Sequence, residues 1–401
     1  MQNLKYYEQQ VNNRFGTSAA PPIEASMVPE TARPHALPWR RIPAADVAIF
    51  DDGSDDAQAV VAALRQEDAV LLPIHPLETD RWPAETFVES GFVSVSASYR
   101  TMFFEPAKGG ILEAASGSPG TLMLKLHLER PLPGIHGDRR ISPQIAQKCV
   151  SLSPFLQEIF SSDPLGADCE VVPEFLGLSG AGTGVIFRRL PSGPVLPLFS
   201  LFSRDDQLTG GESHIDAALR RLYGDDSMRA ADAIGDELAR PLLRPLFTGF
   251  RHGFSVEMHA QNVLFRPGAQ ALIERVYIRD LEGVVLSNAY RVARGLEPVF
   301  TELDNPALTG NQTPMTRWFN RNVDHDLGRV FSASLEALER SGYFGPRERA
   351  RAIRSIRAAA RQTAREAKLE RLNRPGRWLP VSRSPYGNGL GKGHYYVTRY
   401  R

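Results

Sequence analysis

Apolar residues in the first half of the chain recur mainly with the period of β-strands. The stretches "AVLLPIHP", "GFVSVSASYRTMFF" and "GTLMLKLHLE" are apolar runs or alternate between apolar and polar positions, and residues 169–203 have the same character. Two helices interrupt them. "DDAQAVVAALRQ" has acidic residues in its first turn, and "ISPQIAQKCVSLSPFLQEIF" begins with Ser142 as a plausible N-cap and Pro143 behind it. We therefore predict a sheet-rich first half.

The second half has mostly helical spacing. "ESHIDAALRRLYG", "MRAADAIGDELARPLLRPLFTGF" and residues 314–372 predict helices, and a hairpin of 253–266 with 270–280 interrupts them. The Pro- and Ala-rich beginning reads as an arm or linker. These patterns predict three parts, which are an arm over 1–45, an α/β subdomain over 46–205, and a mostly helical subdomain over 206–401 that carries the hairpin 253–280.

The first strand of that hairpin, "HGFSVEMHAQNVLF", carries an unusual row of polar groups. Alternation places apolar residues on one face and Ser255, Glu257, His259 and Gln261 on the other, with Asn262 at the end and Asp280 on the second strand. Carboxylate and amide oxygens suit Mg²⁺ on a polyphosphate. Kinases and small-molecule phosphotransferases use a similar set of Asp, Asn five residues later, and a further Asp. The alternative is a half-exposed hairpin whose polar side chains face water.

Basic and hydroxyl side chains upstream are candidates for binding phosphate. Ser98, Arg100 and Thr101 in "SASYRT" offer two hydroxyls and a guanidinium, although exposed strand residues would look the same. Lys125 lies on the polar face of an otherwise apolar strand, and Arg139 comes just before a helix N-terminus. Such groups together make an anion site. A snorkelling lysine and surface arginines would explain them equally well.

The segment "GLSGAGTGVIFRR" resembles a phosphate-binding loop in its glycines. It lacks the Gly-Lys-Ser/Thr ending of a P-loop, and a strand follows where the dinucleotide fingerprint requires a helix. A glycine-rich turn between strands is the better interpretation, with Arg188 beyond it as a candidate site residue.

Composition narrows the class of protein. The chain has 401 residues, 42% hydrophobic and 23% charged, which is typical of a soluble globular protein, and a net charge of +1 argues against bulk nucleic-acid binding. Residues 346–401 are rich in Arg, which indicates either a solvated helix face or an anionic partner. Cys149 and Cys169 have no metal-ligand spacing, and no signal peptide or membrane span is evident, so we expect a cytoplasmic protein. The absence of a Ser–His–Asp elbow and of HExxH disfavours hydrolase and zinc functions.

Taken in order, these stretches resemble the NRPS-independent siderophore (NIS) synthetases of the aerobactin-synthetase type. The matching strings are "LLPIHP", "SASYRTMF", "LKLHL", "RRISP", "GVIFRR", "HGFSVEMHAQNVLF" and "YIRDLEG", within residues 65–285. The resemblance implies an α+β, hand-like fold. It has a mainly antiparallel β-sheet nucleotide-binding (fingers-like) subdomain and a mostly helical (palm-like) C-terminal subdomain.

Members of that family use ATP and Mg²⁺ to adenylate a carboxylate, commonly of citrate, and pass the acyl group to an amine or hydroxylamine with release of AMP. The resemblance implies small-molecule carboxylate and amine substrates, with neither nucleic acid nor membrane as partner, and it is compatible with a homodimer. It also implies a set of roles for individual residues. These are phosphate and nucleotide binding by Ser98, Arg100, Thr101, Lys125, Arg188 and Gln261, action at the α-phosphate and substrate carboxylate by Lys125, Arg139 and His259, and Mg²⁺ binding by Glu257, Asn262 and Asp280.

The sequence departs from the family pattern in three places. Family members usually have an additional N-terminal subdomain, which this chain is expected to lack. The aromatic that usually follows His-Pro is replaced in "HPLETD", and Glu282 is inserted into the end of the Arg-Asp motif, "RDLEGV". Two other functions therefore stay open. One is a small-molecule phosphotransferase that uses Glu257, Asn262 and Asp280, and the other is a non-catalytic relative that binds a metabolite or a partner synthetase.

Overall fold

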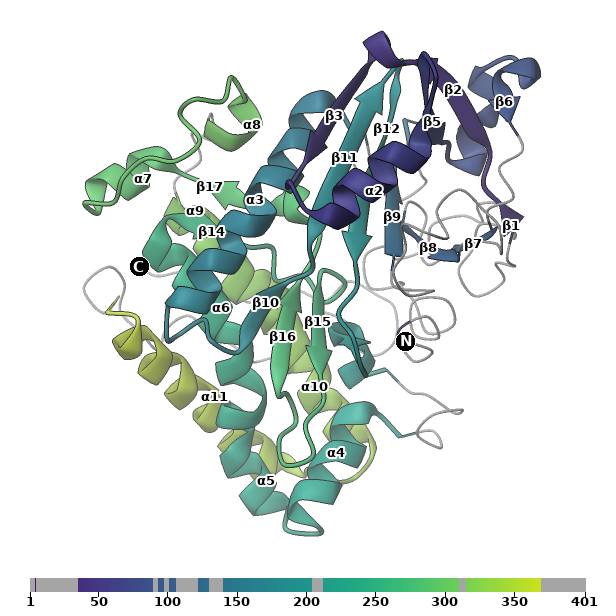
Figure 1. Ribbon diagram of the computed structural model, residues 1–401. Helices are drawn as coiled ribbons and strands as arrows, with labels where there is room; N and C mark the ends of the chain where they lie inside the picture. The colour runs from purple at the N-terminus through teal and green to yellow at the C-terminus, as the bar shows by residue number, and fades with distance from the viewer. Residues whose placement is uncertain are drawn as a thin grey trace. The chain divides into compact units, whose positions relative to one another are not determined.

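The computed structural model describes Leu4 and residues 35–88, 93–96, 101–105, 122–129, 140–203, 212–309 and 315–368. The chain forms two compact units, shown in Figure 1. The first unit comprises Met1–Leu156 and Val172–Pro194, and the second comprises Gln157–Val171 and Val195–Arg401. Most of the predicted N-terminal arm lies outside the described residues, and its last part forms the first two strands.

The first unit is built on two antiparallel sheets. The larger has seven strands in the order β1-β7-β8-β9-β12-β11-β3, and the smaller has four in the order β4-β5-β2-β6. The strands are β1 (His35–Ala36), β2 (Trp39–Pro43), β3 (Val47–Asp51), β4 (Arg65–Gln66), β5 (Ala69–Pro73), β6 (Phe87–Val88), β7 (Val93–Ser96), β8 (Thr101–Glu105), β9 (Leu122–Leu126), β11 (Glu174–Gly180) and β12 (Thr183–Arg189). The mainly antiparallel sheet predicted from the sequence is confirmed.

Helix α2 (Asp55–Leu64) covers one face of these sheets, as Figure 1 shows. The Ser54 hydroxyl accepts a hydrogen bond from the backbone N–H of Ala57 at 3.3 Å, which satisfies one of the free donors of the first turn. Val60 and Leu64 are fully buried in a cluster with apolar residues of β9, β11 and β12. The predicted helix is confirmed because its apolar spacing is amphipathic and its cap is local.

Helix α3 (Pro143–Ser162) packs against the opposite face of the large sheet. A Cβ at Gly177 would lie 3.0 Å from Cβ of Ala146, so this glycine allows the helix to approach the strand closely. The β11–β12 connection is a tight turn in which Ala181 and Gly182 both have positive φ, 47° and 74°. These glycines therefore serve packing and turn formation, in agreement with the predicted turn.

The second unit is mostly helical, as predicted, with two small sheets. Strands β10 (Cys169–Val171), β16 (Arg275–Ile278), β15 (Val263–Arg266) and β13 (Leu196–Pro197) form one sheet in that order, and β14 (Phe254–Ser255) pairs with β17 (Val285–Leu286). The helices are α4 (His214–Tyr223), α5 (Ser227–Ile234), α6 (Arg240–His252), α7 (Asn288–Ala293), α8 (Pro306–Thr309), α9 (Met315–Arg321), α10 (Gly328–Arg340) and α11 (Pro346–Glu366), with π-helical turns η7 (Gly235–Ala239) and η9 (Asn322–Leu327).

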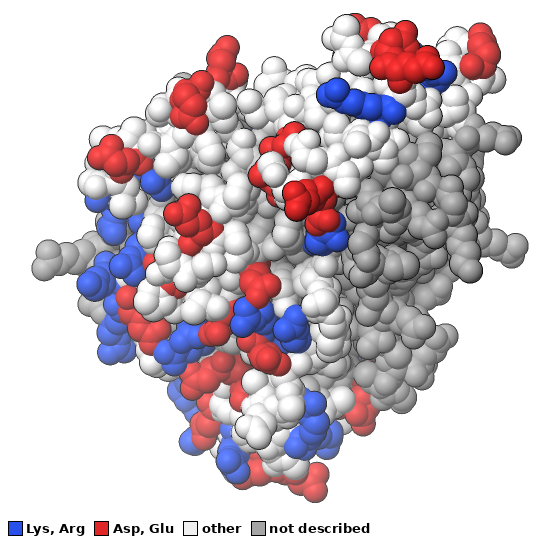
Figure 2. Space-filling model, in the orientation of Figure 1, with Lys and Arg blue, Asp and Glu red and all other residues white. Residues whose placement is uncertain are grey.

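Helix α11 explains the described part of the Arg-rich region. Its buried face is made of small and aliphatic residues, including Ala352 and Ile356, which pack on α5 and α6. Its arginines point outward, and Lys and Arg side chains gather over this helix in Figure 2. Arg351 pairs with Asp232, and Arg349 with Glu339. Up to residue 368 the arginines of this region therefore form the solvated face of an amphipathic helix.

Among the described residues, no helix combines the length and the hydropathy that a membrane span requires. Cys149 and Cys169 are both buried and form no disulfide.

Burial of His214 makes the stability of the second unit depend on pH. The imidazole at the start of α4 packs edge-to-face on Phe265, and burial, with the Arg221 charge nearby, lowers its pKa from 6.5 to about 4. The unfolded chain therefore binds a proton at this residue below pH 6.5 that the folded chain does not bind until about pH 4. The free energy of unfolding should fall as the pH drops through this window.

We expect that His214→Phe removes this dependence. Urea unfolding at pH 7 and pH 5 should show that the wild type loses about 2 kcal/mol more than the variant between the two pH values. Equal losses in the two proteins would show that His214 does not titrate in this range.

Candidate functional site

The predicted site residues are distributed over both units. Ser98, Arg100 and Arg139 lie outside the described residues, and only the backbone of Thr101 is described. Lys125 and Arg188 belong to the first unit. The remaining five belong to the second unit and are Glu257, His259, Gln261, Asn262 and Asp280.

The segment "HGFSVEMHAQNVLF" is not one continuous strand. Phe254–Ser255 pairs with Val285–Leu286, residues 256–262 lie in no sheet, and the hairpin is limited to Val263–Arg266 with Arg275–Ile278. The predicted pairing of 253–266 with 270–280 therefore needs correction. The alternation predicted which side chains are apolar, but a strand can exchange its partner along its length without a change in that pattern.

A turn after Met258 presents the imidazole of His259. The carbonyl oxygen of His259 accepts hydrogen bonds from the N–H groups of Asn262 at 2.8 Å and Val263 at 3.2 Å. Its Nδ1 accepts the N–H of Gln261 at 3.3 Å. A neutral imidazole that accepts at Nδ1 carries its proton on Nε2. His259 is half-buried, and in this tautomer Nε2 is a hydrogen-bond donor.

Glu257 and Asn262 are in direct contact. Nδ2 of Asn262 donates to Oε2 of Glu257 at 2.9 Å, and the guanidinium of Arg321 lies 3.9 Å from Oε1. The carboxylate also lies against Gly283, where a Cβ would overlap Oε2. The glycine that follows the inserted Glu282 therefore still makes room for the carboxylate of Glu257.

The Arg-Asp motif lies at the same end of the hairpin. The N–H of Arg279 donates to the carbonyl oxygen of Asn262 at 3.0 Å, and its guanidinium donates to the carbonyl oxygen of Gln261 at 2.9 and 2.6 Å. Asp280 follows with a left-handed backbone, φ 67°, and begins the 3-10 helix η8 (Leu281–Gly283). Such a conformation costs free energy in a residue other than glycine and is concentrated at functional sites.

The oxygen-bearing side chains of Glu257, Asn262 and Asp280 are of the kinds that bind a small divalent cation. Glu257 and Asn262 are half-buried side chains within hydrogen-bond distance of each other. Asp280 is half-buried and follows Arg279, whose N–H binds the carbonyl oxygen of Asn262. Within the described ranges no three His, Cys, Asp or Glu side chains are grouped as a metal site. A set of two carboxylates and one amide is nonetheless what Mg²⁺ needs when phosphates and waters complete its octahedron. The residues present therefore fit Mg²⁺ on a nucleotide.

Lys125 and Arg188 lie on the face of the seven-stranded sheet that includes Gly177. Lys125 is fully buried in the fourth strand, opposite Ile186 on one side and the backbone of Thr101 on the other. Arg188 is 1% exposed, and its Nε lies 2.6 Å from Oε1 of Glu174 on the neighbouring strand. Both faces of β9 are buried, whereas alternation predicted a polar face, because the sheet is covered on both sides.

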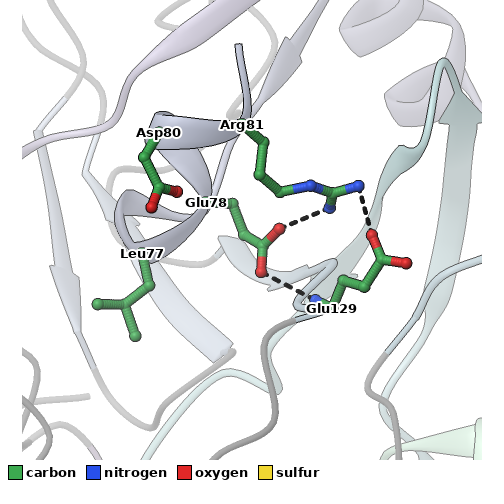
Figure 3. Close-up of a pocket in the computed structure, with 5 residues that line it drawn as sticks. All are labelled: Leu77, Glu78, Asp80, Arg81 and Glu129. Atoms are coloured by element: carbon green, nitrogen blue, oxygen red, sulfur yellow. Dashed lines mark hydrogen bonds and ion pairs between the residues drawn. The ribbon is translucent and has the colours of Figure 1, made fainter.

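The His-Pro motif caps a short helix. Nδ1 of buried His75 accepts the N–H of Leu77 at 3.1 Å at the start of the 3-10 helix η4 (Pro76–Arg81). Glu78 from this helix binds Arg81 at 2.6 Å and the N–H of Glu129 at 3.0 Å, at the edge of a cavity of about 280 Å³ (Figure 3). Arg81 also pairs with the carboxylate of Glu129. The motif residue thus has a structural role in the described part of the chain.

Burial lowers the pKa of His127, two residues after Lys125, although the nearby Glu78 carboxylate opposes this effect. Nδ1 of His127 accepts the N–H of Ile141 at 3.1 Å. This histidine is therefore neutral at physiological pH and joins the strand to the start of α3.

Asn322 contacts residues on both sides of Glu257 and was not recognised from the sequence. It is 2% exposed and binds the backbone of Met258 and the hydroxyl of Ser255. It lies 60 or more residues after these partners, in a stretch with no motif, so local spacing carries no signal for it.

Comparison with known proteins gives matches by structure. No family model matches the chain, and no curated protein matches its sequence. ATP-bound aerobactin synthetase IucA from a hypervirulent pathotype of Klebsiella pneumoniae matches with a TM-score of 0.68 and 17% identity, over 92% of this chain and 71% of that one. Aerobactin synthetase IucC from the same organism matches with a TM-score of 0.61 and 16% identity, over 85% and 64%.

The petrobactin biosynthesis protein AsbB from Bacillus anthracis also matches, with a TM-score of 0.56 and 14% identity, over 88% of this chain and 70% of that one. The chain thus spans about two thirds of the length of these proteins. The chain therefore has the fold of the NRPS-independent siderophore synthetases.

Proposed function

We propose that this protein is an ATP-dependent synthetase that activates a carboxylate as its adenylate and condenses it with an amine, hydroxylamine or alcohol. The activated acid is a citrate-like polycarboxylate, and the product belongs to siderophore or related natural-product biosynthesis in the cytoplasm. The observation that carries the proposal is the turn over Glu257, His259 and Asn262, because it combines oxygens of the kind that bind a cation with a hydrogen-bond donor. The shared fold with an ATP-bound synthetase supports it.

The first step joins two anions. A carboxylate oxygen of the substrate attacks the α-phosphorus of ATP, and the bond to pyrophosphate breaks. Repulsion between the carboxylate and the phosphates opposes this approach, so the reaction needs fixed positive charge. We assign this role to Lys125 and Arg139, and phosphate binding to Ser98, Arg100 and Thr101. Mg²⁺, when held by Glu257, Asn262 and Asp280, neutralises phosphate charge and polarises the P–O bond.

The second step breaks the bond between the acyl carbon and AMP. The nucleophile attacks the acyl carbon, loses a proton to solvent or to a base, and AMP leaves. Because Nδ1 of His259 accepts a backbone N–H, its Nε2–H is suited to donate to an oxygen that gains negative charge. We therefore assign His259 to polarising the reacting group, and Gln261 to the nucleotide.

Arg188 has a weaker case as a nucleotide ligand than the sequence indicated. Its ion pair with buried Glu174 already neutralises its charge. The two carboxylates and the amide could also serve a phosphotransferase, which would cleave the bond to the γ-phosphate instead. The nucleotide product distinguishes the two reactions.

The test is to incubate the protein with ATP, Mg²⁺, hydroxylamine and a panel of polycarboxylates, and to identify the nucleotide product by chromatography. AMP with pyrophosphate and a hydroxamate is the expected result. ADP with a phosphorylated substrate, and no AMP, would show that the protein is a phosphotransferase and not a synthetase. Tight binding of Mg·ATP without turnover on a broad panel would favour a non-catalytic relative. Omission of the carboxylate is the control, and it should abolish the formation of AMP.

A further inference from the structure

Asn322 binds the chain on both sides of Glu257, through the backbone of Met258 and the side chain of Ser255. Its Oδ1 accepts the N–H of Met258 at 2.8 Å, and its Nδ2 donates to the hydroxyl of Ser255 at 3.0 Å. The remaining Nδ2 proton is directed to the carbonyl oxygen of Trp318 at 3.1 Å, in the preceding helix turn. The buried amide thus uses its acceptor and both donors. Its partners belong either to helix α9 or to the segment that contains Glu257.

The segment around Glu257 needs such a partner. Residues 256–259 lie outside any sheet, so the N–H of buried Met258 has no ladder acceptor. A buried backbone N–H without an acceptor costs free energy, and Asn322 supplies the acceptor that a neighbouring strand would otherwise provide. The side chain replaces part of a sheet at the point where the chain leaves the strand pairing.

Asn322 occupies a special place in its own helix. It is the first residue of the π-helical turn η9, directly after α9. Such turns insert one extra residue into a helix and are frequently found at functional sites. The preceding residue, Arg321, lies 3.9 Å from Oε1 of Glu257. The junction of α9 and η9 therefore contacts both the backbone and the carboxylate of this segment.

The carboxylate of Glu257 contacts both Asn262 and the backbone at Gly283. Oε2 accepts a hydrogen bond from Asn262 at 2.9 Å and packs against the α-carbon of Gly283. A shift of the backbone at Ser255 or Met258 would move the carboxylate out of this arrangement. Fixing the backbone therefore fixes the oxygen donors.

We propose that Asn322 is a positioning residue that sets the conformation of residues 255–258 and thereby the metal-binding geometry of Glu257. The proposal rests on the proposed function in one respect, since the metal role of Glu257 belongs to it. The effect of Asn322 on the conformation of the segment does not depend on that function.

The experiment compares Asn322→Leu and Ser255→Ala with Thr363→Val in the full-length protein. Leu has nearly the shape of Asn but removes all three hydrogen bonds, and Ser255→Ala removes only one. Thr363→Val removes a buried hydrogen bond to the carbonyl oxygen of Ala359 in α11, within the same unit, and is the matched control. For each variant the Mg²⁺ concentration at half-maximal ATP binding is measured by calorimetry. Amide hydrogen exchange of residues 254–262 is measured without ligand.

We expect Asn322→Leu to raise the half-maximal Mg²⁺ concentration about 10- to 100-fold and Ser255→Ala to raise it less, with no change in Thr363→Val. Exchange at Met258 should accelerate in Asn322→Leu and not in the control. Wild-type Mg²⁺ dependence in a folded Asn322→Leu, or in Ser255→Ala if the Leu variant does not fold, would overturn the metal-binding part of the proposal. Unchanged exchange in the same variant would overturn its structural part.

Failure of the proposed function gives a different result. If the wild type forms ADP in place of AMP, the comparison of Mg²⁺ dependence still applies. If the wild type does not bind Mg·ATP at all, hydrogen exchange alone decides whether Asn322 positions the segment.

Discussion

Replacing His259 by alanine is expected to lower the rate of acyl transfer by about 100- to 1,000-fold, with little change in stability. The imidazole is half-buried and its Nδ1 accepts a hydrogen bond of 3.3 Å from the backbone N–H of Gln261, so the substitution does not open a cavity in the fully buried core. The Nε2–H donor, which we assign to an oxygen that gains charge, is lost completely. Hydroxamate formation at saturating ATP and carboxylate measures the rate, and urea unfolding measures the stability.

His259→Gln is the matched control because its terminal amide can place a donor near the position of Nε2. If His259 polarises an oxygen, Gln should retain more activity than Ala. If His259 instead removes a proton from the nucleophile, the two variants should be equally impaired, since an amide is no base. Wild-type rates in His259→Ala would remove this residue from the mechanism.

Replacing Glu174 by alanine is expected to lower the free energy of unfolding by about 3–5 kcal/mol. Glu174 and Arg188 are both buried in the large sheet, at 0% and 1% exposure, and their side chains are 2.6 Å apart. Loss of the carboxylate leaves the guanidinium in a poorly solvated environment without this counter-charge. Guanidinium chloride unfolding monitored by circular dichroism gives the change.

Asp56→Ala provides the control on the adjacent arginine. It removes the partner of Arg189, and Asp56 has a side chain that is 45% exposed, so a cost of no more than about 1 kcal/mol is expected. Equal losses in Glu174→Ala and Asp56→Ala would contradict the assignment of a buried structural pair.

A double variant, Glu174→Leu with Arg188→Met, tests the nucleotide role predicted for Arg188. Replacing both partners by apolar side chains should recover much of the stability, because no unpaired charge remains. If the double variant still binds Mg·ATP with wild-type affinity, Arg188 is no nucleotide ligand. Loss of binding in a stable double variant would restore that role.

Local patterns predicted most elements of this fold. Helix α2 follows from its apolar spacing and the acidic residues of its first turn, and α3 from Ser142 and Pro143 at its start. The turn at Ala181 and Gly182 follows from its glycines, and the outward arginines of α11 follow from helical spacing. These features depend on residues within one or two turns of each other, so the sequence contains all of their partners.

The polar row in residues 255–262 was also evident from the sequence, including the proximity of Glu257 and Asn262. Alternation determined that Glu257 and His259 are less buried than Val256 and Met258. The period of two carries no information about the pairing partner, however. The period is the same where Phe254–Ser255 pairs with β17 and where Val263–Arg266 pairs with β16.

Contacts between distant residues were decided only by the tertiary structure. Arg188 was predicted to bind the nucleotide because the sequence did not reveal its ion pair with Glu174. The two residues lie on the two strands that the glycine-rich turn connects. Alternation placed Ser255 on the polar face of a strand, yet Ser255 is 1% exposed and binds Asn322, 67 residues further along the chain. The hydrophobicity of a side chain predicts how far it is buried away from water. The partner that satisfies a buried polar group is set by packing across the fold, so only the structure identifies it.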